Sequence, residues 1–349
     1  MAMTENAPLV VGVIFPAKKI DHLRDVLQET KDGVRFVLVD LYDAGVTSAQ
    51  SITEKYGAFD AILHKLAHEM VFARLGDTDA AKRLDIIQKY VLQNPCVKII
   101  DPIESVLLLT NRHAACDMLV KLQHKSANAK NDDAAGSKTD TATISFCVPK
   151  FHVIETHEQF EALCRQVDAQ ETKLPLICKS VEACATDRSH MMSVITQRSD
   201  LQFVEYPALY QEFINHSGRL FKGYVLGDII NVAERRSLPN IHAGATHVHF
   251  NTQKQYPTAD DFHPDATDSL IATADATHRD QSEIFAAVRV IGERIREELN
   301  LSLFGFDVIV SDATQELYVI DVNYFPSYKE LDDFSIVLRK HIKQRCMGP

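Results

Sequence analysis

The sequence predicts an α/β protein that begins with a doubly wound parallel sheet. Short apolar runs alternate with helix-like segments over residues 8–110, which is typical of the strands and helices of such sheets. Further α/β units are expected after this part, because 349 residues are enough for two or three domains with large cores. Near the C-terminus, two strand-like runs carry acidic side chains at matching positions.

The first unit is expected to contain four strands, Val10–Phe15, Arg35–Leu41, Ala61–Leu66 and Val97–Ile100. Helices are expected after the first strand and over Leu84–Leu92. Ligands of parallel sheets collect at the carboxyl ends of strands, and Lys18, Lys19 and His64-Lys65 follow two such ends. Solvated lysines that bind nothing are the alternative. No G-x-G-x-x-G motif follows the first strand, which argues against a dinucleotide site.

The next stretch, Glu104–Lys121, is expected to be one helix that carries Arg112. Residues 126–143 are small and polar and cannot bury a core, so we expect a mobile loop there. A βαβ-like unit follows, with strand Val148–Val153, helix Glu158–Ala169 and strand Leu174–Lys179. Lys179 ends an apolar strand, where an ammonium group suits a phosphate.

The polar stretch Ser180–Ser193 is expected to be a loop. It contains His190, which either donates to a phosphate or is only solvated. Leu209–Asn215 is the next expected strand. Leu220–Asn231 then reads as a hairpin with Lys222 on its first strand and a Gly-Asp pair at its turn.

Arg235, near the end of the return strand, is followed by a second arginine, and only one of the two can face a ligand. Asn251–Thr277 is polar and irregular. Gln281–Leu299 is expected to be a helix, because its apolar residues repeat at helical spacing. Asp280 and Glu283 at its start resemble a capping box.

Leu303–Glu330 is expected to form two antiparallel strands joined by a polar hairpin loop. If Val310 pairs near Tyr318, Asp307 lies almost opposite Asp321, and Asn323 shares the face of Asp321. Two carboxylates this close repel unless a cation lies between them. Carboxylate and amide oxygens suit Mg²⁺ that is shared with nucleotide phosphates. An exposed polar face that binds no metal is the alternative.

The net charge, the cysteines and the absence of long apolar runs argue against several classes of function. A formal net charge of −11 argues against a broad nucleic-acid or anionic-membrane surface. The seven cysteines show no metal-binding spacing and are best explained as free thiols in a reducing cytosol. No targeting segment or apolar run of spanning length is visible, so we expect a cytoplasmic protein.

The order of these pieces resembles the inositol polyphosphate kinases of the inositol-tetrakisphosphate 1-kinase, or inositol-1,3,4-trisphosphate 5/6-kinase, family, which have the ATP-grasp fold. The matching segments are Pro16–Ile20, Asp60–Leu66, Ile100–Arg112, Leu176–Val194, Gln211–Arg236, Ser237–Asn240 and Leu303–Tyr328. The joint match is far more specific than any single piece. It implies a Rossmann-like domain over residues 1–112 and two ATP-grasp subdomains, over 113–208 and 209–349, with ATP between them.

The resemblance also implies roles for individual residues. Substrate phosphates would be held by Lys19, Lys65, His190 and Lys222, with Arg235 adding positive charge and Asn323 nearby. ATP would be met by Arg112, Lys179, the backbone of Gln211, Glu212, Phe213 and Ile214, and Ser237. Asp307, Asp321 and Asn323 would hold one or two Mg²⁺, and Lys222, His190 and Asp307 would serve the transfer itself.

The chain departs from the family pattern at two places. Cys184-Ala185 stands where the family usually has His-Gly, and Pro326-Ser327 where it has Pro-Gly. Both changes fall on the expected inositol side, so they bear on positional specificity. An ATP-grasp carboxylate–amine ligase and a non-catalytic inositol phosphate or nucleotide binder are the alternative functions. We expect a monomer that acts on small molecules.

Overall fold

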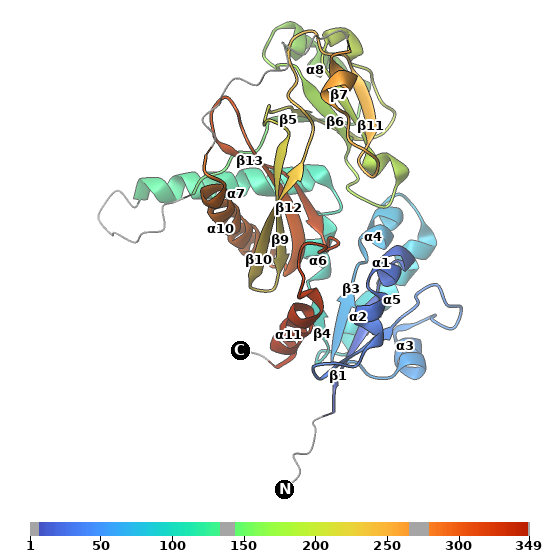
Figure 1. Ribbon diagram of the computed structural model, residues 1–349. Helices are drawn as coiled ribbons and strands as arrows, with labels where there is room; N and C mark the ends of the chain where they lie inside the picture. Colours follow the sequence, from blue (N-terminus) through green and yellow to red (C-terminus); the bar gives the residue numbers. More distant parts are fainter. Residues whose placement is uncertain (1–6, 133–143, 265–278, 348–349) are drawn as a thin grey trace.

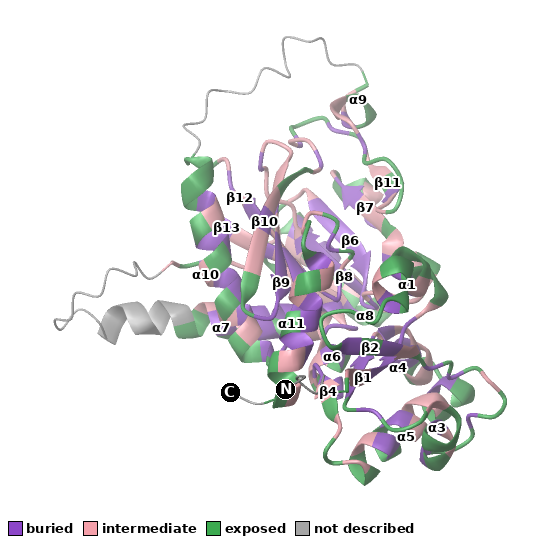
Figure 2. Cartoon of the chain, turned by 60° about the horizontal axis from the view of Figure 1, so that its bottom comes forward, coloured by how far each residue is buried: buried purple, intermediate pink, exposed green. Residues whose placement is uncertain are grey.

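The computed structural model describes residues 7–132, 144–264 and 279–347, with side chains described outside 126–132. Three sheets organise the chain (Figure 1), and we call them the N-terminal, central and C-terminal sheets. Their strands are mostly buried, whereas the helices that cover them expose their outer faces (Figure 2). No helix among the described residues is both long and apolar enough to cross a membrane.

The N-terminal sheet is parallel, with the order β2-β1-β3-β4. Its strands are β1 (Leu9–Ile14), β2 (Val34–Leu38), β3 (Ala61–His64) and β4 (Lys98–Ile100). Its helices are α1 (Ala17–His22), α2 (Arg24–Gln28), α3 (Ala49–Tyr56), α4 (Ala67–Arg74) and α5 (Thr78–Gln93). The four expected strands are confirmed. Val11, Val13 and Leu63 are fully buried, as the apolar runs predicted.

The expected helix Glu104–Lys121 is in fact two helices, α6 (Ile103–Leu108) and α7 (Arg112–Asp132). The side chain of Asn111 accepts a hydrogen bond from Ala114 N at 3.1 Å, so it caps a new helix. The expected loop over residues 126–143 is wrong in its first part, because α7 continues to Asp132. Residues 133–143 lie outside the described part.

The central sheet has the order β11-β7-β6-β8-β5. Its strands are β5 (Phe151–Ile154), β6 (Leu176–Ser180), β7 (Met191–Ile195), β8 (Ala208–Glu212) and β11 (Val248–Asn251). The short 3₁₀ helices η2 (Asp187–His190) and η3 (Arg198–Asp200) lie on either side of β7. Helix α8 (His157–Asp168) connects β5 to β6, which are both antiparallel to β8 and therefore parallel to each other, as in the expected unit.

The expected loop Ser180–Ser193 ends in a strand, because the apolar run that begins at Met191 pairs as β7 with β6. The second ATP-grasp subdomain was expected to begin at residue 209. Strand β11 lies after this residue, but it pairs with β7 of the central sheet and not with the C-terminal sheet. The short helix α9 (Ala259–Phe262) interrupts the expected irregular stretch Asn251–Thr277, of which residues 265–278 lie outside the description.

The C-terminal sheet is antiparallel, with the order β10-β9-β12-β13. Its strands are β9 (Arg219–Leu226), β10 (Ile229–Arg236), β12 (Leu303–Val310) and β13 (Leu317–Tyr324), and its helices are α10 (Gln281–Leu299) and α11 (Phe334–Met347). The expected hairpin is confirmed, with Gly227 at φ 61° in its two-residue turn.

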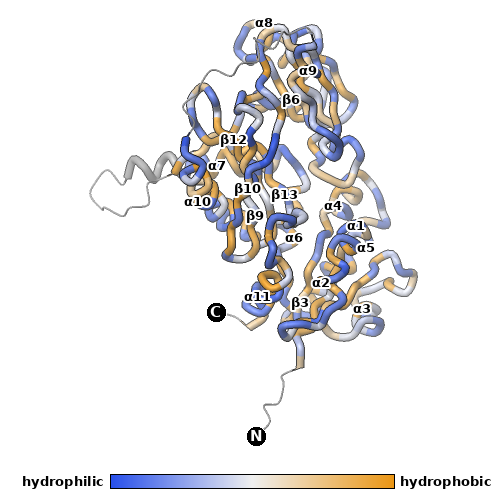
Figure 3. Tube along the Cα trace, in the orientation of Figure 1, coloured by the Kyte–Doolittle hydropathy of each residue, from blue (hydrophilic) through white to orange (hydrophobic). Residues whose placement is uncertain are grey.

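Helix α10 has the expected bounds and covers one face of this sheet, where strands and helix share an apolar layer (Figures 1 and 3). The expected capping box is not formed, because the Asp280 side chain accepts from Ser282 instead. The ring of Phe306 lies against Gly292 of α10. Strand alternation therefore points the neighbouring Asp307 to the opposite face of the sheet.

Candidate active site

The predicted pairing of the two acids is confirmed, because Asp307 of β12 lies opposite Asp321 of β13. At the hairpin end, Val310 pairs with Leu317, one residue from Tyr318 and so near the expected partner. A β-bulge between Asp307 and Val308 takes up the difference of one residue. Without this bulge, the strand register would offset the two carboxylates.

Lys222 of β9 lies opposite Asp307 on its other side, with Nζ 2.6 Å from Oδ1. Burial lowers the pKa of Lys222, but the carboxylate of Asp307 outweighs burial and raises the pKa above its usual value. Burial, reinforced by Asp321, raises the pKa of Asp307. The pKa of Asp321 is instead lowered, since Arg112 and Lys179 outweigh the effect of burial.

Asn323 completes a set of oxygen donors on this face. Its Nδ2 donates to Asp321 Oδ2 at 2.8 Å, which leaves its own Oδ1 for a ligand. Within the described part of the chain, Asp307 Oδ2, Asp321 Oδ1 and Asn323 Oδ1 accept no hydrogen bond. These hard oxygens fit a divalent cation such as Mg²⁺. Over the same described residues, no cluster of three or more His, Cys, Asp or Glu side chains forms an alternative metal site.

Lys179 approaches this face from the central sheet. It is 6% exposed, and its Nζ donates to Gln211 Oε1 at 2.8 Å. Burial lowers the pKa of Lys179, while the charge of Asp321 opposes that shift. A small enclosed space is lined by Lys179, Gln211, Asp321 and Arg112, so the predicted nucleotide residues and a predicted metal ligand come together.

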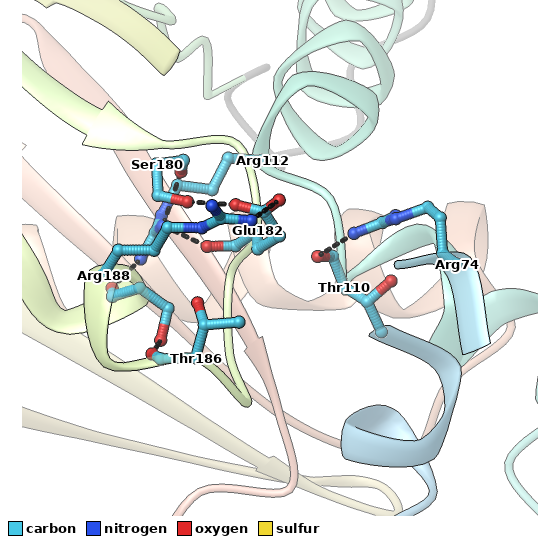
Figure 4. Close-up of polar contacts among 8 residues, drawn as sticks. Arg74, Thr110, Arg112, Ser180, Glu182, Thr186 and Arg188 are labelled. Carbon is cyan, nitrogen blue, oxygen red and sulfur yellow. Dashed lines mark hydrogen bonds and ion pairs between the residues drawn. The ribbon is translucent and has the colours of Figure 1, made fainter. Parts of the chain in front are cut away.

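Arg112, at the start of α7, holds the segment that follows β6 (Figure 4). Its guanidinium donates to the carbonyls of Ser180 and Glu182, both at 2.7 Å, and of Ser189 at 2.9 Å. Glu182 in turn accepts from Arg188 at 2.8 Å. Both terminal nitrogens of Arg112 are thus committed to backbone carbonyls, and Arg112 shapes the segment that leads to His190.

The segment Gln211–Ile214, whose backbone is expected to meet ATP, already uses part of its backbone groups within the protein. Glu212 N donates to Lys150 O at 2.8 Å, and Phe213 N donates to Pro175 O at 3.1 Å. The Ile214 carbonyl bonds to the ring of His216, which also contacts Ser237 Oγ at 2.9 Å. Beside Ser237 is a cavity of about 320 Å³, lined by Ser217, Gly218, Arg236, Asn240, His242 and others.

A larger cavity of about 580 Å³ lies between the N-terminal sheet, the segment after β6 and the end of β13. Its charged and imidazole side chains are those of Lys18, Lys19, Lys65, Lys329, His22, His68 and His190. No acidic side chain of the described residues lines it. We call it the basic cavity. Its wall also contains Asn323, so it meets the acidic face at this residue.

The predicted substrate residues divide into two groups. Lys19, Lys65, His190 and Asn323 line the basic cavity, as expected. Lys222 and Arg235 do not line it, because they project from the C-terminal sheet, where Lys222 pairs with Asp307 and Arg235 pairs with Glu330. Arg235 pairs with Glu330 and does not line the cavity, so its contribution to the substrate cluster stays a prediction.

Sequence reasoning missed four further cavity residues, His22, His68, Gln253 and Lys329. His68 lies three residues after Lys65, in the first turn of α4, and a second basic side chain so close to a strand end could have indicated it. Gln253 contacts the ring of His190 at 3.0 Å, and no local pattern marks that contact.

Two lysines, the buried Lys19 and the half-buried Lys65, form the wall near β13. Lys19 Nζ donates to Pro326 O at 2.6 Å and lies 4.0 Å from the ring centroid of Phe325. Lys65 Nζ donates to Phe325 O at 2.9 Å. Burial, followed by the charge of Lys65, lowers the pKa of Lys19 to about 6. Burial also lowers the pKa of Lys65.

Comparisons with known proteins agree with this geometry. Residues 140–344 match the model of the inositol 1,3,4-trisphosphate 5/6-kinase ATP-grasp domain. The chain belongs to this family. Its relatives include inositol-tetrakisphosphate 1-kinase of Danio rerio, 29% identical over 321 residues that cover 91% of this chain and 73% of the relative. Inositol-tetrakisphosphate 1-kinase 4 of Glycine max is 29% identical over 310 residues, which cover 87% and 78%.

Solved structures confirm the ATP-grasp fold expected from the resemblance. A RimK domain ATP-grasp protein from Sphaerobacter thermophilus aligns with a TM-score of 0.53 and 15% identity, covering 97% of this chain and all of the other. VanG D-Ala:D-Ser ligase from Enterococcus faecalis gives a TM-score of 0.55 at 13% identity, covering 97% and 99%. At such identities the similarity concerns the fold alone.

Proposed function

We propose that the protein is an ATP- and Mg²⁺-dependent kinase that transfers the γ-phosphoryl group of ATP to a ring hydroxyl of an inositol polyphosphate. The observation that carries this proposal is the basic cavity, which is free of acids among the described residues and meets the acidic face at Asn323. Family membership supports the same reaction. A polyanionic acceptor would fit the basic cavity, and a metal-bound nucleotide would fit the acidic face. The two sites meet at Asn323.

Asp307, Asp321 and Asn323 are the residues that would hold Mg²⁺, through the oxygens that no hydrogen bond occupies. The ion supplies charge neutralisation for the nucleotide's β- and γ-phosphates. We assign Lys179 to the ATP phosphates; the bond of its ammonium to Gln211 and the small space that it lines together with Asp321 support this assignment. Ser237 and its cavity lie beside the segment Gln211–Ile214, to which His216 links Ser237, and we assign the nucleoside to this place.

The acceptor's phosphates are assigned to Lys19, Lys65 and His190, with Lys18 and His68 as further hydrogen-bond donors of the basic cavity. Phosphoryl transfer requires mainly positioning and electrostatic stabilisation. Lys222 lies next to Asp307, on the side away from Asp321, and its ammonium is suited to stabilise charge on the transferring group. All of these residues come from one chain, which supports action as a monomer.

The ligase alternative shares the fold but accounts less well for the cavity. A carboxylate and an amine do not require four lysines and three histidines around one cavity of about 580 Å³. A non-catalytic binder has no need for two opposed, half-buried acids beside a lysine.

Product analysis separates the three functions. The protein is incubated with ATP, Mg²⁺ and each member of a panel of inositol tris- and tetrakisphosphates, and the products are resolved by anion-exchange chromatography. We expect a more highly phosphorylated inositol and an equal amount of ADP. ATP consumption that requires a carboxylate and an amine would indicate the ligase. Binding of both ligands without turnover would indicate the non-catalytic alternative.

A further inference from the structure

We propose that Asp101 is a positioning residue that fastens the N-terminal wall of the basic cavity to strand β12. It thereby sets the place of the phosphoryl acceptor relative to the acidic face. The inference rests on the proposed kinase function and adds a residue that touches neither substrate nor metal.

Asp101 directly follows β4 and is 1% exposed. Its carboxylate accepts three hydrogen bonds from the first residues before and within β12. Ser302 donates to Oδ1 from its backbone N at 2.6 Å and from its hydroxyl at 2.7 Å. Leu303 N donates to Oδ2 at 2.9 Å. One buried carboxylate thus joins the end of the N-terminal sheet to the strand that carries Asp307.

These bonds belong to a closed ring that passes through the cavity wall. Leu303 O accepts from Phe325 N at 2.8 Å, and Phe325 O accepts from Lys65 Nζ at 2.9 Å. Lys65 follows His64, whose ring contacts Asp101 O at 2.9 Å. The ring therefore runs from Asp101 through Leu303, Phe325 and Lys65 and returns to Asp101 through His64.

The ring links residues of the acceptor site to residues of the metal-binding strands. Lys65 and Phe325 line the basic cavity, and Asn323, which the cavity shares with the acidic face, lies close to Phe325 in the chain. Tyr324 adds a parallel link, because its hydroxyl donates to His64 O at 3.1 Å. A shift of β12 relative to β3 would therefore move the cavity's cations away from the acids. Such a shift would impair acceptor binding more than nucleotide binding.

The backbone of Asp101 explains why this residue type fits. Its φ is 67°, a left-handed conformation that Asp and Asn adopt more readily than other side chains. Asn would keep this conformation and the side-chain volume. Each carboxylate oxygen of Asp101, however, accepts from a backbone N–H. In Asn one of these oxygens is replaced by an NH₂ group, which would face a backbone N–H and cannot accept its hydrogen bond. Asp101→Asn thus removes the fastening with little change in shape.

The test compares Asp101→Asn with Ile87→Val, a core substitution in α5 that lies away from the ring. Each variant is assayed for KM of the acceptor, KM of ATP, the ratio of phosphoryl transfer to acceptor-independent ATP hydrolysis, and thermal unfolding. We expect Asp101→Asn to raise the acceptor KM by about 10-fold and to lower the transfer ratio, with the KM of ATP within about twofold. Ile87→Val should lower only the melting temperature.

A second variant covers the case in which Asp101→Asn does not fold. Ser302→Ala keeps the backbone donor but removes the hydroxyl that bonds to Asp101, so it should shift the same quantities in the same direction by a smaller factor. An unchanged acceptor KM and transfer ratio in either folded variant, with only the melting temperature lowered, would overturn the positioning role and leave the kinase function intact. A wild-type protein that phosphorylates no inositol phosphate would overturn the function itself, and this inference with it.

Discussion

Lys222 and Asp307 lie opposite each other on neighbouring antiparallel strands, with Nζ 2.6 Å from Oδ1. Asp321 lies on the other side of Asp307, so one cation and two anions form a row across β9, β12 and β13. Lys222 occupies only Oδ1 of Asp307, and Asn323 occupies only Oδ2 of Asp321. The second oxygen of each carboxylate is therefore left to bind a divalent cation.

Replacing Lys222 tests the charge at the start of this row. Lys222→Met keeps an unbranched side chain but removes the ammonium, and we expect kcat/KM for the acceptor to fall by about 100-fold or more. Arg219→Met is the control, because Arg219 lies on the same strand but pairs with Glu234. Steady-state kinetics measure both. If Lys222→Met changed thermal stability alone, Lys222 would have only a structural role.

Replacing Asp321 tests the metal site. Asp321→Asn should lower kcat by about 1000-fold and abolish the dependence of nucleotide affinity on Mg²⁺. Because the folded protein lowers the pKa of Asp321, its ionised form contributes stability at neutral pH, and that contribution disappears as pH falls through the lowered pKa. The variant should therefore melt at a lower temperature at pH 7, with a smaller difference from wild type in acid.

Glu316→Gln serves as the control for Asp321, since it removes one negative charge from the exposed hairpin loop that leads into β13. Turnover and melting temperature should both stay near wild type. Turnover of Asp321→Asn close to that of this control would remove the metal assignment.

Binding of the acceptor should be coupled to proton uptake at Lys19. Its pKa is about 6 in the free protein, so at pH 7.5 the side chain is mostly neutral. A bound polyanion favours the charged form and raises this pKa, so binding takes up a proton above pH ~6 and takes up little below it. Calorimetric titration in buffers of different ionisation enthalpy measures the uptake. Lys19→Gln should reduce it, and an equal uptake in that variant would exclude Lys19 as the site.

Ala185 should cost stability because of its backbone. Its φ is 75°, a left-handed conformation that disfavours a Cβ, although the chain has Ala here where the family pattern has Gly. Ala185→Gly is expected to raise the free energy of unfolding by about 1 kcal/mol. Ala183→Gly, two residues earlier and without a positive φ, should lower it instead. Urea unfolding measures the free energy of unfolding of both variants. If both variants were less stable than the wild type, the backbone at Ala185 would not be strained.

Much of the site followed from the sequence because it depends on strand alternation. Period-two spacing placed Asp307 beside Asp321, and the antiparallel pairing of β12 with β13 agrees. The end of the hairpin was one residue off, because a bulge leaves no mark in the alternation of apolar residues. The break before α7 was missed although Asn111 is a residue type that commonly caps helices.

The basic cavity could be predicted only in part. Lys19 and Lys65 lie at strand ends, which is where parallel sheets collect ligands. Gln253 and Lys329 come from segments far away in the chain, and no local pattern brings them together. The pairing of Arg235 with Glu330 could not be predicted for the same reason, since Glu330 lies beyond the end of β13 and the pair became evident only from the fold.

The most direct measurement follows the label of γ-labelled ATP in the presence of Mg²⁺ and an inositol trisphosphate. The proposed kinase predicts that the label appears in an inositol tetrakisphosphate in an amount equal to the ADP formed, and that Asp321→Asn eliminates both products. Label that appears only as free phosphate, or ADP formation that does not depend on the inositol phosphate, would contradict transfer from the acidic face into the basic cavity.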